Sequence, residues 1–245
     1  MRSGHCIKKA LLRLFTFLLC IIILLGVFFG IKGYRLYWEA AAEKPIEETM
    51  EEIRSEEHFT RYSELPQFYI DAVISVEDRR FERHPGIDPI AICRATWVDI
   101  RAGYYKQGGS TITQQLVKNQ LFTQDKIMQR KVAEVFAVLD VEAKYTKKEI
   151  FELYVNTIYF GNGYYGIYDA SMGYFGKIPS ELTEYESVML AGLPNAPSVY
   201  SLDANKDLVL QRIEQVLNSM VRNKLLTREE ADSLQNQSKD RRNLH

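Results

Sequence analysis

An uncharged apolar run near the N-terminus, residues 14–31, constrains this chain of 245 residues more than any other feature. As an α-helix, a run of this length spans roughly 27 Å, close to the hydrocarbon thickness of a bilayer. Four basic residues precede the run, and such an excess of positive charge predicts a cytoplasmic N-terminus. The sequence therefore predicts a cytoplasmic segment at 1–13, a transmembrane helix at 14–33 and an outward-facing remainder.

Two other interpretations of the run compete with an uncleaved anchor. A buried core helix is disfavoured because no charge interrupts the run. A cleaved signal peptide is the stronger alternative, since small alanines follow at 40–42. However, the run is longer than a usual signal core, and Lys32 and Arg35 lie between it and those alanines. We therefore expect a single-pass anchor that stays attached.

Composition limits what the rest of the chain can do. Apolar residues make up 46% of the sequence, enough for a sizeable core. A net charge of −1 argues against a general nucleic-acid binder. The three cysteines, Cys6, Cys20 and Cys93, have neither metal-ligand spacing nor the pattern of a disulfide framework. We expect a connector rich in Glu and Lys at 34–62, a folded domain at 63–235 and a frayed tail at 236–245.

The periodicity of the folded part is helical. Apolar residues at three-to-four spacing predict an amphipathic helix over 126–145, and a further helix is expected over 205–224. Capping boxes, a Thr followed three residues later by a Glu, predict helix starts at Thr146, Thr183 and Thr227. No hairpin signal and no alternation of strands with helices is visible. The predicted fold class is mainly α, preceded by one transmembrane helix.

The first candidate for chemistry is a charged run that holds Glu77 and Asp78 beside two arginines. Neighbours on a helix point about 100° apart, so the two carboxylates cannot do the same job. One can face a cleft while the other pairs with an arginine. The ordinary alternative is a solvated, salt-bridged helix face, which the run alone favours.

The second candidate follows a glycine pair and combines hydroxyls, amides and a cation, from Ser110 to Asn119. Ser and Thr favour the N-cap of a helix, and a helix N-terminus attracts anions. With the basic residues that follow, a diphosphate is the natural ligand. A polar helix with a solvated basic face remains an equal alternative. Glu134, three and four residues after Lys131 and Arg130, is either a local ion-pair partner or a second acid in a cleft.

Residues 63–202 resemble the peptidoglycan glycosyltransferases, the family 51 glycosyltransferases, because five motifs of that family occur in order. These motifs are Glu77-Asp78-Arg79-Arg80-Phe81 with His84 and Gly86; Gly108-Gly109-Ser110-Thr111-Ile112-Thr113-Gln114-Gln115 with Lys118-Asn119; Arg130-Lys131-Val132-Ala133-Glu134; Lys148-Glu149-Ile150 through Glu152, Tyr154 and Asn156 to Tyr159-Phe160-Gly161; and Ala191-Gly192-Leu193-Pro194 with Pro197-Ser198. Five ordered motifs are far more specific than any one of them.

The resemblance implies a lysozyme-like, mainly α domain with a membrane-associated jaw lobe in the bacterial cytoplasmic membrane. It implies that lipid II is polymerised into glycan strands with inversion and that undecaprenyl diphosphate is released. Glu77 would be the general base on the acceptor hydroxyl. Glu134 would support the diphosphate end, through basic residues or a divalent cation such as Mg²⁺ or Mn²⁺. The implied partners are lipid II, the glycan strand, the bilayer and other cell-wall synthesis proteins.

The residues that the resemblance assigns to substrate binding come from the first four motifs and the segment between the second and the third. They are Asp78, Arg79, Phe81, His84, Ser110, Thr111, Thr113, Gln114, Gln115, Lys118, Asn119, Lys126, Arg130, Lys131, Asn156 and Tyr159. Lys126 is a departure, because the family often has arginine there, and lysine keeps the charge but loses the bidentate fork. No Ser-x-x-Lys motif follows the fifth motif before His245, so a monofunctional enzyme is expected.

Two other functions compete with polymerisation. A lysozyme-like lytic enzyme shares the paired carboxylates, but cleavage of a glycan requires neither a basic anion site nor an anchor. A membrane scaffold without activity could keep the fold, but the presence of both Glu77 and Glu134 argues against it.

Overall fold

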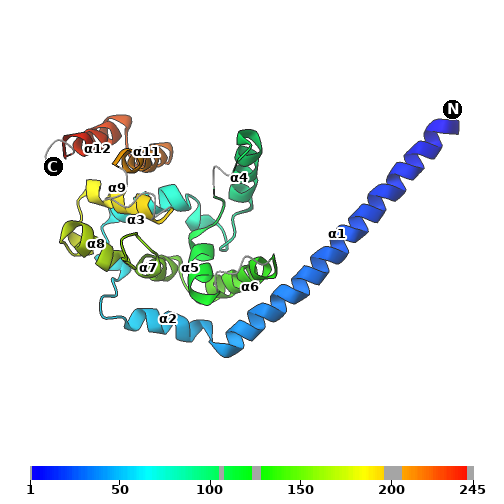
Figure 1. The fold of residues 1–245 in the computed structure, drawn as a ribbon, viewed down its shortest axis with the longest axis horizontal. Helices are drawn as coiled ribbons and strands as arrows, with labels where there is room; N and C mark the ends of the chain where they lie inside the picture. Colours follow the sequence, from blue (N-terminus) through cyan, green and yellow to red (C-terminus); the bar gives the residue numbers. More distant parts are fainter. Residues whose placement is uncertain (1, 105–107, 123–127, 196–205, 242–245) are drawn as a thin grey trace.

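The computed structural model describes residues 2–104, 108–122, 128–195 and 206–241. Figure 1 shows one long N-terminal helix that extends away from a compact group of shorter helices. The described residues contain no strand beyond an isolated bridge between Tyr159 and Tyr165. The predicted mainly α fold class is confirmed.

The N-terminal helix α1 runs without a break over Arg2–Glu43. Its part from Leu11 onward is apolar and long enough to cross a membrane, and the apolar window is not buried against the protein. The helix continues past the predicted end of the membrane segment at residue 33, so the first part of the expected connector is an extension of the anchor. Pro45 then separates α1 from α2 (Ile46–Ser55), because the residue before a proline disfavours helix.

The remaining elements are short helices joined by loops. In chain order they are η1 (Tyr62–Glu64), α3 (Gln67–Glu77), η2 (Phe81–Arg83), α4 (Pro89–Ala102), α5 (Ile112–Leu121), α6 (Met128–Lys144), α7 (Lys147–Thr157), α8 (Ile167–Phe175), η3 (Pro179–Glu181), α9 (Glu184–Gly192), η4 (Leu193–Asn195), α11 (Lys206–Arg222) and α12 (Arg228–Arg241). All three predicted capping boxes form, at Thr146, Thr183 and Thr227.

The hydrophobic core lies where α3, α5, α7, α9 and α11 meet. Tyr69, Tyr154 and Phe151 are among its largest fully buried side chains. Ile46 and Met50 of α2 also belong to this core, although they precede the expected start of the folded domain at residue 63. Because α3 packs on both α9 and α11, its C-terminal end is enclosed on the side of the later helices.

Helix α4 differs from the other helices of the domain. Among its residues only Ala95 is buried, while Ile90, Ile92, Trp97 and Ile100 are exposed. Large apolar side chains on an open face normally mark a contact with a partner or a membrane. Helix α4 also projects from the rest of the domain on the same side as the free end of α1 (Figure 1).

Candidate active site

Glu77 is the last residue of α3, and its carboxylate is enclosed by two other helices. The Nη2 of Arg212, on α11, lies 3.0 Å from Oε1 of Glu77, and the Nε2 of Gln115, on α5, donates to Oε2 at 2.9 Å. The side chain of Glu77 is only 6% exposed. A solvated charged face, the ordinary interpretation of this run, is therefore wrong for Glu77.

Arg212 is held in place by the end of α9. Its Nε donates to the carbonyl oxygen of Gly192 at 2.9 Å, and its Nη1 donates to Gln215 at 3.0 Å. A Cβ on Gly192 would lie 3.0 Å from Cγ of Arg212, so the glycine of the fifth motif leaves room for the arginine. The fifth motif thus contributes to the surroundings of Glu77 through Arg212.

Sequence reasoning missed Arg212. The signal that could have found it is its place in the helical pattern of α11. It lies three residues after Val209, four before Val216 and eight before Met220, so it shares the face of the helix that carries these buried residues. A charged residue on a buried stripe requires a buried partner, because an unpaired charge is costly in a core.

Gln115 links Glu77 to the core. Its Oε1 accepts a hydrogen bond from the hydroxyl of Tyr154 at 3.4 Å, which leaves its amide nitrogen directed at Glu77. Burial and then the negative charge of Glu77 raise the pKa of Tyr154 well above its usual value. Tyr154 therefore stays protonated and keeps its role as donor.

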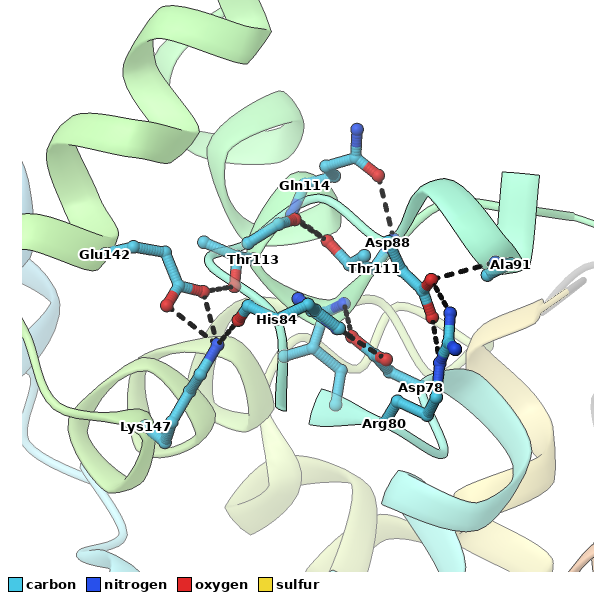
Figure 2. A network of polar contacts seen from close by, with 12 residues as sticks. Asp78, Arg80, His84, Asp88, Ala91, Thr111, Thr113, Gln114, Glu142 and Lys147 are labelled. Carbon is cyan, nitrogen blue, oxygen red and sulfur yellow. Dashed lines mark hydrogen bonds and ion pairs between the residues drawn. The ribbon is translucent and has the colours of Figure 1, made fainter. Parts of the chain in front are cut away.

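Asp78, the neighbour of Glu77, has a different environment. It accepts a hydrogen bond from the backbone N–H of Ile112 at 3.1 Å and contacts Nε2 of His84 at 2.9 Å. Figure 2 shows Asp78 and His84 facing one another inside the loop after α3. The expectation that the two carboxylates differ is confirmed, because Glu77 pairs with an arginine, Arg212, whereas Asp78 pairs with histidine and backbone. That one of them faces a cleft stays a prediction.

The arginine of the same loop pairs with an aspartate further along. Arg80 forms an ion pair with Asp88 through its Nε at 2.9 Å and through its Nη2. Asp88 in turn accepts from the backbone N–H of Ala91 at 2.8 Å and so caps α4 (Figure 2). The first motif therefore connects the end of α3 to the start of α4.

The polar residues at the start of α5 form a second part of this network. Thr111 caps α5 and forms a capping box with Gln114, and its hydroxyl donates to the carbonyl of Gly86. Thr113 donates to Glu142, which is paired with Lys147 at 2.7 Å (Figure 2). These predicted substrate-binding side chains contact other parts of the protein here, so they hold the loops around Glu77.

Three more of the predicted residues also make internal contacts. Phe81 is 1% exposed and packs near Phe151. Asn156 joins α7 to the chain at Thr60 by two hydrogen bonds of 2.8 Å. Tyr159 accepts from the backbone N–H of Gly163 at 3.2 Å. Direct contact of these buried or bonded side chains with a substrate stays a prediction.

The other predicted residues lie at the surface or outside the described part of the chain. Lys118 and Asn119 are exposed near the end of α5, and Arg79 and Ser110 are exposed in loops. Lys126 lies outside the described residues. The exposed members remain reachable for a ligand.

Glu134 lies in the second turn of α6 and is 1% exposed. Its two carboxylate oxygens face two cations from the preceding turn, with Nε of Arg130 at 3.1 Å and Nζ of Lys131 at 2.5 Å. The side chain of Lys131 is 52% exposed, whereas that of Arg130 is 14% exposed. The interpretation of Glu134 as a local ion-pair partner is confirmed. The carboxylate is also buried, and a role as a second acid in a cleft stays a prediction.

Two places among the described residues are candidates for binding a divalent cation, a cluster of three side chains and the single carboxylate of Glu134. The ligand atoms of Asp78, His84 and Asp88 lie within 4.8 Å of one another, but the backbone of Ile112 and Arg80 already bind the carboxylates. Glu134 offers a single carboxylate whose oxygens both face cations. Hard divalent cations take several oxygen ligands, so neither group fits such an ion without ligands from a substrate.

Comparison with known proteins decides the family. The family model described as transglycosylase matches residues 43–221. The chain belongs to the transglycosylase family. The prediction from the five motifs, a domain of the peptidoglycan glycosyltransferases, is confirmed at the level of the family.

Two relatives are penicillin-binding proteins that are much longer than this chain. Penicillin-binding protein 1A of Aquifex aeolicus (strain VF5) is 42% identical over 178 residues, which cover 73% of this chain and 24% of that protein. Penicillin-binding protein 1F of Bacillus subtilis (strain 168) is 44% identical over 158 residues, 64% of this chain and 22% of that protein. The chain thus spans about a quarter of the length of the curated relatives it matches.

Proposed function

We propose that this chain polymerises lipid II into glycan strands and releases undecaprenyl diphosphate, with Glu77 as the general base. The observation that carries this proposal is the buried carboxylate of Glu77, directed by Arg212 and Gln115 in a chain of the transglycosylase family. A carboxylate in such an environment can take a proton from a hydroxyl brought within hydrogen-bond reach.

The reaction balances with these residues. Glu77 takes the proton of the acceptor sugar's 4-hydroxyl while that oxygen forms a bond to the anomeric carbon of the donor. The bond from this carbon to the diphosphate breaks on the opposite face, and the diphosphate leaves with the electron pair, which inverts the anomeric centre. Arg130, Lys131 and Lys118 stabilise the departing charge, so a strong general acid is unnecessary.

Two features, α1 and α4, support the proposed membrane location. The basic residues before the apolar run favour a cytoplasmic N-terminus, with the catalytic domain outside the bacterial cytoplasmic membrane. The exposed apolar side chains of α4, among them Ile90, Trp97 and Ile100, support a second contact with the bilayer. Such a placement brings the domain to the surface where a lipid-linked substrate resides.

The test is an assay of the full chain with lipid II in lipid vesicles. Ladders of glycan on a gel are expected. Shortening of preformed glycan strands, without ladders, would instead indicate a lytic enzyme, and the absence of both products would indicate a scaffold. Running the assay with Mg²⁺, with Mn²⁺ and with a chelator shows whether a divalent cation contributes at the diphosphate.

A further inference from the structure

The extension of the anchor helix α1 packs directly on α6, the helix that carries Glu134. The ring of Phe136 on α6 lies 5.2 Å from the ring of Tyr34 and 6.3 Å from that of Tyr37. The hydroxyl of Tyr37 also donates to Oδ2 of Asp140 at 2.8 Å. Figure 1 shows α6 beside the part of α1 nearest the domain. The anchor and the charged site are therefore joined by packed helices.

Gly33 is the point of closest approach between these helices. A Cβ at this position would lie 2.5 Å from both Cβ and Cγ1 of Val132 and 3.1 Å from the backbone nitrogen of Ala133. Because these atoms belong to the helix itself or to a stiff branched side chain, they cannot move aside independently. By contrast, Gly26 and Gly30 of the same helix have no atom within 4 Å of a built Cβ.

The order of the contacts sets the direction of packing. Gly33 meets Val132, and Tyr37 further along α1 meets Asp140 further along α6. The helices therefore run in the same direction, and the start of α6, with Arg130 and Lys131, is the end nearest to the apolar run.

Gly33 also lies close to the end of the apolar run that is predicted to cross the membrane. It lies two residues after the last residue of the apolar run, about 3 Å along the helix axis. The cations at the start of α6 then lie close to where the hydrocarbon layer ends, at the level of the lipid headgroups. A diphosphate attached to a membrane lipid occupies the same level.

We propose that Gly33 is a positioning residue, which seats the start of α6 at headgroup depth so that Arg130 and Lys131 meet a lipid-linked diphosphate. This inference rests on the proposed function and adds to it the part of the anchor. In this arrangement α1 acts as a rigid support of the charged site and does more than tether the domain.

The test compares Gly33→Leu with Gly30→Leu, the matched change at an open position of the same helix. Misplacement by about 1 Å can cost on the order of 100-fold in rate, so Gly33→Leu is expected to lower kcat/KM for lipid II in vesicles to that extent, mainly through KM. Gly30→Leu is expected to stay within about twofold of the wild type, because no atom lies near it.

Two further measurements separate positioning from a loss of folding. In the double variant Gly33→Ala with Val132→Gly, the two atoms closest to the new Cβ, which are Cβ and Cγ1 of Val132, are absent. This variant is expected to recover most of the activity that Gly33→Ala alone loses. A short-chain, water-soluble analogue of lipid II is expected to lose less with Gly33→Leu than the membrane-bound lipid, because its diphosphate is not held at one depth.

The outcomes are distinguishable from failure of the proposed function. If the wild type makes no glycan from lipid II, the proposed function is wrong. If the wild type is active and Gly33→Leu matches Gly30→Leu, the positioning role of Gly33 is overturned while the function stands. Equal losses for the soluble and the membrane-bound substrate would overturn the depth argument, as would absence of rescue by Val132→Gly.

Discussion

The two buried carboxylates, Glu77 and Glu134, are held in opposite ways. The partners of Glu77 lie 38 and 135 positions away in the sequence, on α5 and α11. Those of Glu134 lie three and four positions away on its own helix. The ion pair of Glu77 exists only in the folded domain, whereas the cations that face Glu134 lie on its own helix. The burial of Glu134 still depends on the fold.

The difference extends to what a ligand can reach. The Arg212 side chain is 9% exposed and is bound by Glu77, Gly192 and Gln215. The Lys131 side chain is 52% exposed although it pairs with a buried acid. Arg212 therefore serves to orient a protein group, while Lys131 can turn toward an incoming anion.

The largest effect is expected from Glu77→Gln. Loss of a general base removes about 10²- to 10⁴-fold in rate, so glycan ladders should fall by that factor in the lipid II assay. Circular dichroism on the same sample shows whether the helices are intact. A folded Glu77→Gln variant with wild-type turnover would refute the assignment of Glu77 as the general base. Glu77 and Glu134 would then differ in their structural surroundings only.

Arg212→Met tests the long-range pair through stability. Removing one partner of a buried ion pair costs about 3–5 kcal/mol, and both side chains are almost inaccessible. We expect the free energy of unfolding, measured with denaturant in detergent, to fall by that amount. The control is Arg222→Met, an exposed arginine on the same helix, which should change it by no more than about 0.5 kcal/mol. Equal effects for the two variants would mean that the Glu77 pair contributes nothing to the fold.

Lys131→Met tests the local pair through binding. A hydrogen bond to a charged group contributes about 1.5–3 kcal/mol, which predicts a rise in KM for lipid II of roughly 10- to 100-fold. Stability should fall by less than in Arg212→Met, because Lys131 is half exposed and Arg130 still faces the buried Glu134. The exposed Lys148 supplies the control, with KM unchanged in Lys148→Met. A loss of stability comparable to that of Arg212→Met would show that the two sites do not differ as described.

The smallest effect is expected at Glu149, a partly exposed carboxylate of the capping box at Thr146. A hydrogen bond from the backbone N–H of Thr146, then the Thr146 hydroxyl and Arg54, lower its pKa below the usual value. A group whose pKa is lowered by folding adds stability above its unfolded pKa and loses it as the pH falls through the folded value. Glu149→Gln should therefore lower the melting temperature slightly at neutral pH, with the difference vanishing in acid. A constant difference across pH would contradict this assignment.

Much of the local structure could be predicted from the sequence. The capping boxes at Thr146, Thr183 and Thr227 formed where expected, because a cap involves groups only three residues apart. The pairing of Glu134 with Arg130 and Lys131 was one of the two interpretations of their spacing, for the same reason. The individual partners of Glu77 and Asp78 were not predictable, since many charged side chains are compatible with one helix end.

The sequence by itself determined the apolar helix, the helical content and the order of the motifs, because hydropathy, capping and spacing are properties of neighbouring residues. Tertiary structure alone decided that Arg212 reaches Glu77 and that Gly33 lies against Val132. Both contacts depend on how whole helices pack, and packing selects among many pairings that are equal in local energy. The sequence alone therefore predicts interactions between residues that are near one another in the chain. It does not predict contacts between distant helices.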